Sequence, residues 1–168
     1  MDLSPILILT TGGTIDKQYF DALSEYQIGA SITGRTLEIA RVTHPFRVLN
    51  LMRKDSLDLT GSDRLQIDEA VKIATEERVI ITHGTDTMAE TARALSDHTA
   101  KTIVLVGALT PAAFSESDAT FNLGMAFACC QIAPPGVYIT MNGTVFDGNR
   151  VTKDRENGVF RVVDTPPR

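Results

Sequence analysis

The chain has 168 residues, of which 43% are hydrophobic and 22% charged, and its formal net charge is −5. This length and balance are typical of one soluble globular domain that can bury a full core. The mild acidity argues against a nucleic-acid-binding protein, which needs a basic face, and against binding to an anionic membrane surface. No segment reaches transmembrane length, and the apolar N-terminal run is too short for a signal peptide and lacks its basic flank.

Cysteine and histidine usage also narrows the function. Cys129 and Cys130 are neighbours and cannot form a useful cross-link, so we expect both to be reduced and buried in a cytoplasmic protein. His44, His83 and His98 are scattered and share no spacing with the cysteines. The sequence therefore predicts neither a zinc site nor any other cofactor.

The stretch ILILTTGGTID near the N-terminus predicts a strand that runs into a glycine turn. Residues 6–9 show no polar alternation, which is typical of a strand buried on both faces. Gly12 and Gly13 allow the backbone to turn tightly and another group to approach it closely. Ligands of open α/β sheets bind at the carboxyl ends of strands. The hydroxyls expected there are those of Thr10, Thr11 and Thr14.

The next segments alternate between polar connections and regular elements. Residues 16–34 are polar with little periodicity and predict a long loop or a hairpin. Residues 35–52 predict a short helix or strand and then a strand that ends near Met52. Residues 60–77 predict a helix, because apolar side chains recur at helical spacing. These side chains are Leu65, Ile67, Ala70, Val71, Ile73 and Ala74.

Residues 78–87, RVIITHGTDT, repeat the opening pattern of a buried strand that runs into small and hydroxyl-bearing residues. Thr87 and Glu90 predict a capping box at the start of a helix over residues 88–98. Asp86 stands directly before this helix and is the one carboxylate in the stretch.

The C-terminal third continues the alternation. Residues 101–107 predict a third buried strand, and residues 118–132 predict a helix that is apolar around most of its circumference. Residues 136–153 predict a strand and then a hairpin that turns at Asp147–Gly148. The whole pattern predicts an α/β fold, a mainly parallel sheet with helices on both faces.

If the two strands that end in threonine-rich loops are neighbours, these loops face one another across a crevice outside the sheet. A threonine is a poor nucleophile at neutral pH and needs an adjacent proton acceptor. The plausible acceptors are the tyrosines of residues 16–34 and Lys153, because a lysine among buried groups loses its proton more readily. Backbone N–H groups of the glycine turns could hold a developing oxyanion.

The segments TTGGTI and ITHGTDTMAET resemble the two signature segments of the bacterial-type L-asparaginases, which include the asparaginase–glutaminases. The segments VGALTP, FNLGMAF and MNGTVFDGNRVTK follow in the order found in that family. The resemblance covers most of the chain and implies the fold of the family's N-terminal domain.

This resemblance implies a catalytic role for four residues. Thr11 would be the nucleophile that attacks the side-chain amide of L-asparagine. Tyr26 would help to take the proton of this threonine, with Tyr19 as a rival for the role. Thr85 and Lys153 would form the other half of the catalytic site.

The resemblance also implies how the substrate binds. Asp86 would bind its α-amino group and Ser56 its α-carboxylate, with Asp55 beside Ser56. The implied reaction forms an acyl–threonine intermediate, releases ammonia and is completed by water.

Two departures from the family are visible. Members of the family continue into a second, smaller domain, so we expect residues 1–168 to form a single-domain short form that assembles as a homodimer or a higher homo-oligomer. Leu57 stands where many members carry a polar residue that touches the substrate. We therefore expect asparagine to be preferred over glutamine, a choice that depends on one methylene.

Two further interpretations of the sequence remain open. The chain could be an amino-acid-binding or sensor domain that kept the pocket and lost turnover, or an ammonia-producing subunit of an amidotransferase. His83 precedes a glycine turn, and we expect it to be a hydrogen-bonded structural histidine rather than a base.

Overall fold

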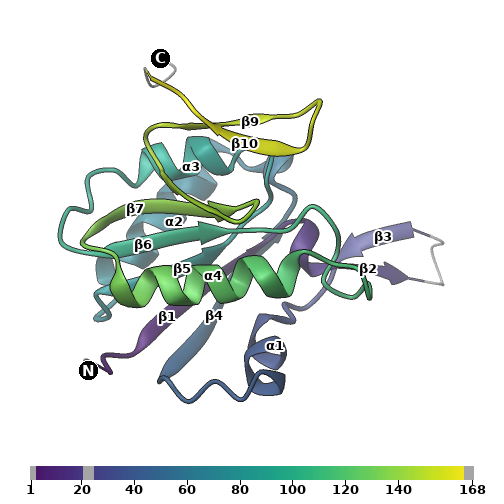
Figure 1. Ribbon diagram of the computed structural model, residues 1–168, viewed down its shortest axis with the longest axis horizontal. Coiled ribbons are helices and arrows are strands. Elements are labelled where there is room, and N and C mark those ends of the chain that lie inside the picture. The colour runs from purple at the N-terminus through teal and green to yellow at the C-terminus, as the bar shows by residue number, and fades with distance from the viewer. Residues whose placement is uncertain (1–2, 21–24, 165–168) are drawn as a thin grey trace.

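The structure is a computed structural model that describes residues 3–20 and 25–164. Its centre is a six-stranded sheet with the order β4-β1-β5-β6-β7-β8 (Figure 1). All neighbours in this sheet are parallel except β7 and β8. Its strands are β1 (Ile6–Gly12), β4 (Phe46–Lys54), β5 (Arg78–Thr82), β6 (Thr102–Val106), β7 (Gly136–Met141) and β8 (Thr144–Asp147).

Helices cover both faces of the sheet. The helices are α1 (Thr33–Ile39), α2 (Gly61–Ile73), α3 (Met88–Ala94) and α4 (Ala119–Ile132), with short 3-10 turns η1 (Thr14–Asp16) and η2 (Ser56–Asp58). Helices α2 and α3 pack on one face, while α1 and α4 pack on the other (Figure 1). The predicted fold class is therefore confirmed. No helix among the described residues is long and apolar enough to cross a membrane.

Strand β1 shows why the opening sequence has no polar alternation. Its side chains point alternately to the two faces, and both faces are covered. Leu7 and Leu9 join the core beneath α2 and α3. Ile6 and Ile8 join the core beneath α4. Burial on both faces thus explains why residues 6–9 of this strand are all apolar, while Thr10 and Thr11 lie buried at its carboxyl end.

Two hairpins lie outside the main sheet and carry candidate site residues. The hairpin of β2 (Lys17–Phe20) and β3 (Glu25–Ile28) belongs to the segment predicted as a loop or hairpin. In Figure 1 it projects away from the central sheet. The hairpin of β9 (Val151–Asp154) and β10 (Val159–Val162) lies on the α3 side, where Val151 and Phe160 enter the core.

The predicted hairpin turn at Asp147–Gly148 is wrong. The turn between β7 and β8 lies at Asn142 and Gly143, whose φ values are 52° and 72°. Two positive φ values match the twist of a tight hairpin, and asparagine followed by glycine is favoured there. Asp147 and Gly148 instead lead from β8 toward β9, which belongs to the two-stranded sheet of β9 and β10.

The predicted capping box of α3 is also wrong. Thr87 stands at the N-cap position, but its side chain makes no capping hydrogen bond. Its hydroxyl donates instead to the backbone carbonyl of Ser56 at 2.7 Å. This tertiary contact fixes the start of α3 against η2. In α2, Leu65 and Ile73 are exposed, so its buried stripe is narrower than the sequence predicts.

Candidate active site

The two glycine-containing loops that follow β1 and β5 touch one another. Strands β1 and β5 are neighbours, with Thr10 opposite Thr82 in the parallel register. Gly13 has a φ of 86°, and a Cβ atom there would overlap the backbone of Gly84. The condition on which the predicted crevice depends, that the two strands are neighbours, is therefore met. Glycine is needed at residue 13 both for its backbone angle and for space.

Lys153 reaches this loop pair from strand β9. Its Nζ donates to Thr85 Oγ1 at 2.7 Å and to Asp86 Oδ1 at 2.9 Å. The Lys153 side chain is 13% exposed, so this ammonium is largely removed from water. Arg155 lies at the edge of the cluster, with its Nε 3.8 Å from Asp86 Oδ1 and its side chain 63% exposed. The structure thus brings together Thr85, Asp86 and Lys153.

Ser56 packs against Gly84 of the same loop. Its side chain is fully buried, and its Oγ has no hydrogen-bond partner among the described residues. A Cβ atom at Gly84 would lie 2.6 Å from this oxygen, so the serine packs directly on the loop. A buried hydroxyl without a partner is uncommon in a folded protein.

Tyr26 and Tyr19 stand opposite one another on the β2–β3 hairpin. Their ring centroids are 5.2 Å apart, and Tyr26 also meets Phe114 at 5.8 Å. Each tyrosine is 51% exposed. Neither hydroxyl is placed at Lys153 by a hydrogen bond among the described residues, so the structure does not join the tyrosines to the lysine cluster.

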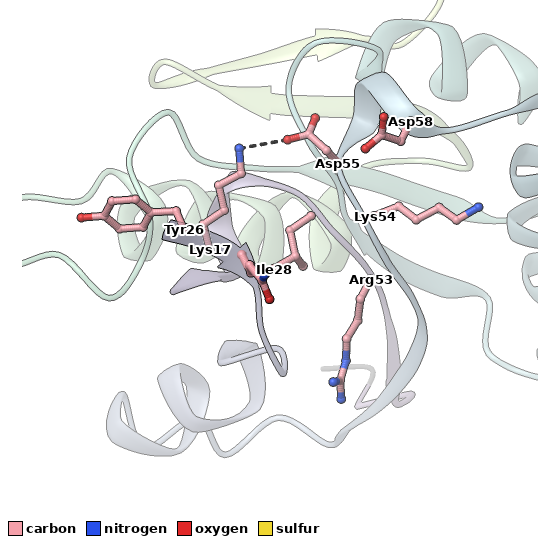
Figure 2. Close-up of a pocket in the computed structure, with 8 residues that line it drawn as sticks. Lys17, Tyr26, Ile28, Arg53, Lys54, Asp55 and Asp58 are labelled. Carbon is pink, nitrogen blue, oxygen red and sulfur yellow. Dashed lines mark ion pairs between the residues drawn. The ribbon is translucent and has the colours of Figure 1, made fainter. Parts of the chain in front are cut away.

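A cavity of about 640 Å³ lies between this hairpin and the end of β4 (Figure 2). It is lined by Lys17, Tyr26, Gln27, Ile28, Arg53, Lys54, Asp55 and Asp58. In Figure 2 the ring of Tyr26 points away from Asp55 and Asp58. Most of the side chains that line the cavity are therefore charged. One of them, Asp55, precedes Ser56 in the chain, and Tyr26 lines the cavity from the β2–β3 hairpin.

Asp55 is held by local contacts within this cavity. It forms an ion pair of 2.9 Å with Lys17 and accepts a hydrogen bond from the Leu57 amide at 3.2 Å. Partial burial would raise the pKa of Asp55, but the bonds from Lys17 and the Leu57 amide lower it below its usual value. Asp55 therefore stays ionised, links the β2–β3 hairpin to η2 and orients the turn that carries Ser56.

Comparison with known proteins identifies the family. Residues 5–167 match the family model described as Asparaginase, N-terminal. The chain belongs to the asparaginase family. It is 35% identical to L-asparaginase 2 of Escherichia coli over 98% of this chain and 51% of that protein. It is 33% identical to a Glutamyl-tRNA(Gln) amidotransferase subunit of Methanococcus vannielii, over 87% of this chain and 36% of that protein.

The structural comparison agrees with the asparaginase assignment. The structure of the thermostable L-asparaginase from Thermococcus kodakarensis superimposes with a TM-score of 0.83 at 28% identity, covering 96% of this chain and 52% of that one. The L-asparaginase I of Vibrio cholerae gives a TM-score of 0.80 at 26% identity. The chain spans about half the length of the curated L-asparaginases that it matches.

In this asparaginase-family site the two threonines that flank the glycine pair differ in their exposure to solvent. Thr11 is 1% exposed, belongs to strand β1, and its hydroxyl donates to the Thr82 carbonyl at 2.8 Å. Thr14 follows the glycines, opens η1 and is only half-buried. The hydroxyl of Thr11 thus lies against the strand that leads into the second loop and is bonded to its backbone.

His83 supports the second loop as a structural residue, as predicted. It is completely buried, with Nδ1 2.7 Å from the Gly84 carbonyl and Nε2 2.8 Å from Thr91 Oγ1. Burial lowers the pKa of His83 to about 4, so the ring is neutral at neutral pH. Among residues 3–20 and 25–164, no group of three His, Cys, Asp or Glu side chains is arranged to hold a metal ion.

Proposed function

We propose that this chain hydrolyses the side-chain amide of L-asparagine to give L-aspartate and ammonia. The observation that carries the proposal is the contact of Lys153 Nζ with both Thr85 Oγ1 and Asp86 Oδ1, beside the touching glycine loops. A lysine that is held by a carboxylate and bonded to a hydroxyl can exchange a proton with that hydroxyl, which supports a role for Thr85 and Lys153 in proton transfer. Membership in the asparaginase family supports the same reaction class.

The α-amino and α-carboxylate groups of the substrate have separate partners in this proposal. Asp86 meets Lys153 and Arg155 through Oδ1, and we assign Oδ2 to the substrate ammonium. The unpartnered hydroxyl of Ser56 donates to the α-carboxylate. Asp55 acts indirectly, by holding the turn that presents Ser56.

The reaction itself is proposed to proceed in two steps. The hydroxyl of Thr11 turns from the Thr82 carbonyl and attacks the amide carbonyl, and Tyr26 takes part in removing its proton. Backbone N–H groups of the glycine loops stabilise the oxyanion, the proton taken from Thr11 passes to the amide nitrogen, and the C–N bond breaks to release ammonia and leave an acyl–threonine. Thr85 and Lys153 then handle the proton of the water molecule that releases aspartate.

The test is ammonia release from L-asparagine and L-glutamine by the wild type, Thr11→Val and Thr14→Val. We expect release from asparagine to be lost in Thr11→Val, because the nucleophile is gone, and to persist in Thr14→Val. Loss only in Thr14→Val would assign the nucleophile to the more accessible threonine. No release by the folded wild type would reject the amidohydrolase and favour an amino-acid-binding domain, which calorimetry with asparagine would detect.

We propose that asparagine is preferred over glutamine. Leu57, next to Ser56, offers no polar contact to the longer amide, and its side chain is exposed. One methylene is worth on the order of 1–3 kcal/mol in a pocket of this kind. Equal kcat/KM for the two amides would reject the preference.

The relative from Methanococcus vannielii keeps open a role as the ammonia-producing subunit of an amidotransferase, which co-purification of a second chain would favour. We also propose a homo-oligomer, since Phe121 and Ile132 leave apolar side chains exposed on α4. Light scattering of the purified chain would measure the mass of the assembly and so the number of subunits.

A further inference from the structure

We propose that Asn142 is a positioning residue that holds the β9–β10 hairpin, and with it Lys153, against the second glycine loop. The inference rests on the proposed function of Lys153, but the contact it describes can be measured without any assay of turnover. Asn142 lies in the turn between β7 and β8, so it belongs to the central sheet and not to the hairpin it contacts.

The side chain of Asn142 makes the connection between the two sheets. Its Oδ1 accepts the backbone N–H of Phe160 at 2.9 Å, and its Nδ2 lies 3.5 Å from the Gly158 carbonyl. Strands β9 and β10 form a separate two-stranded sheet, without a backbone ladder to β7 or β8. The side-chain amide of Asn142 thus takes the place that a ladder hydrogen bond would hold.

Phe160 is the residue of β10 that stands directly opposite Lys153. Residue pairs in an antiparallel ribbon alternate between hydrogen-bonded and non-hydrogen-bonded pairs. The Phe160 N–H points to Asn142, and the Val163 N–H bonds the Arg150 carbonyl at 2.9 Å, so Phe160 and Lys153 form a non-hydrogen-bonded pair. Without Asn142 the Phe160 amide would have no partner within its own hairpin.

Burial makes this amide contact significant. Phe160 is 5% exposed, and its ring lies 6.3 Å from that of Phe146 on β8. A backbone N–H in such surroundings is costly to leave unpaired. The ring contact and the amide contact together fix β10 relative to β8, and the register of the hairpin then fixes Lys153 at Thr85 and Asp86.

The backbone of Asn142 allows the acceptor role to be separated from the turn role. Its φ of 52° is a conformation that glycine adopts freely and that aspartate tolerates. Asn142→Gly therefore keeps the turn and removes the acceptor, whereas Asn142→Asp keeps both the turn and an acceptor oxygen. The pair of variants isolates the hydrogen bond to Phe160.

The experiment compares wild type, Asn142→Gly and Asn142→Asp in two measurements. The first is the rate of amide hydrogen exchange at Phe160. The second is the rate at which an amine-reactive reagent modifies Lys153, which peptide mass spectrometry follows. We expect Asn142→Gly to raise both rates by about five- to tenfold, the effect of one lost hydrogen bond on local opening. Asn142→Asp is expected to stay within about twofold of wild type for the same reason.

The activity assay adds a second readout. In Asn142→Gly we expect kcat for ammonia release to fall by about tenfold with a smaller change in KM, because a displaced catalytic group costs rate more than binding. Unchanged exchange and labelling in Asn142→Gly, or equal increases in Asn142→Asp, would overturn the inference. If wild type releases no ammonia, the proposed function fails, and exchange and labelling still decide the role of Asn142.

Discussion

The two hairpins outside the central sheet hold their candidate site residues in different ways. The β9–β10 hairpin buries Val151 and Phe160 in the core, and its Lys153 is bonded to two partners on another loop. The β2–β3 hairpin projects from the sheet, and its Tyr26 is half exposed, with ring contacts to Tyr19 and Phe114 (Figure 1).

The lysine half of the site is thus fixed by core packing and buried polar contacts, whereas the tyrosine half is held by partly exposed contacts of the β2–β3 hairpin. The lysine half depends on core packing and on the neutral His83 beneath the second loop. The tyrosine half depends on Asp16, whose carbonyl accepts the Gly29 N–H at 2.9 Å and whose Oδ1 accepts the Ile32 N–H at 3.2 Å. Asp16 thus ties together the two ends of the β2–β3 hairpin.

The largest effect is expected from Lys153→Met. The change removes the ammonium that bonds Thr85 and Asp86, and we expect kcat for ammonia release to fall by about 10²- to 10⁴-fold, as for loss of a general acid or base. Arg155→Met is the matched control, since this arginine also approaches Asp86 but is largely exposed. We expect Arg155→Met to lower kcat by less than about threefold. An equal decrease of kcat in both variants would contradict the proposed catalytic role of Lys153.

The pH dependence of stability tests the support of the lysine half. His83 has a folded pKa of about 4 against an ordinary value of 6.5, so between these pH values the unfolded chain binds a proton that the native state does not. The free energy of unfolding should therefore fall as pH falls through this window, by roughly 3 kcal/mol in total. Urea denaturation at several pH values measures the slope, and His83→Gln should remove this component. The same slope in His83→Gln would show that other groups cause it.

The tyrosine half offers a matched pair of substitutions. Tyr26 and Tyr19 are opposite one another and equally exposed, so Tyr26→Phe and Tyr19→Phe should change the free energy of unfolding by less than about 0.5 kcal/mol each. We expect Tyr26→Phe to lower kcat by about tenfold, through loss of its part in proton transfer. Tyr19→Phe should leave kcat nearly unchanged. The reverse order would assign the role to Tyr19.

The smallest effect is expected at Asp16. Burial raises the pKa of Asp16, while hydrogen bonds from Ser31 and the Ile32 amide and the charge of Arg53 partly offset this. A raised folded pKa stabilises the fold at low pH, and this contribution is lost as pH rises through that value. Hydrogen exchange of β2 and β3 should therefore accelerate with pH beyond its intrinsic rate. Asp16→Asn should remove this dependence while Glu25→Gln, on the exposed face, should not.

The sequence predicted the central sheet well because its signals are local and strong. The uninterrupted apolar runs of β1, β5 and β6 correspond to strands buried on both faces. The adjacency of β1 and β5 was a condition of the predicted crevice, and their parallel pairing meets it. The turn at Asn142 was missed because Asp147–Gly148 has the same type of signal, and only the pairing of β7 with β8 distinguishes them.

The candidate site was less accessible to sequence reasoning because it depends on contacts between distant segments. The role of Thr87 could not be predicted, since its hydroxyl prefers the Ser56 carbonyl, 31 residues away, to the helix it precedes. The burial of Thr11 depends on where β1 ends, and strand ends are poorly marked in a sequence. Lys153 was a plausible proton acceptor from the sequence, the family resemblance implied its catalytic role, and its partners Thr85 and Asp86 became visible only in three dimensions.

The position of Lys153 in the chain has a consequence for how the protein folds. Its contact with Thr85 closes a loop of 68 residues, which contains α3, β6, α4, β7 and β8. Forming such a contact costs loop entropy that the intervening elements must first offset. A refolding chain therefore completes the lysine cluster after the sheet has assembled, and recovery of any catalytic function should lag behind recovery of secondary structure.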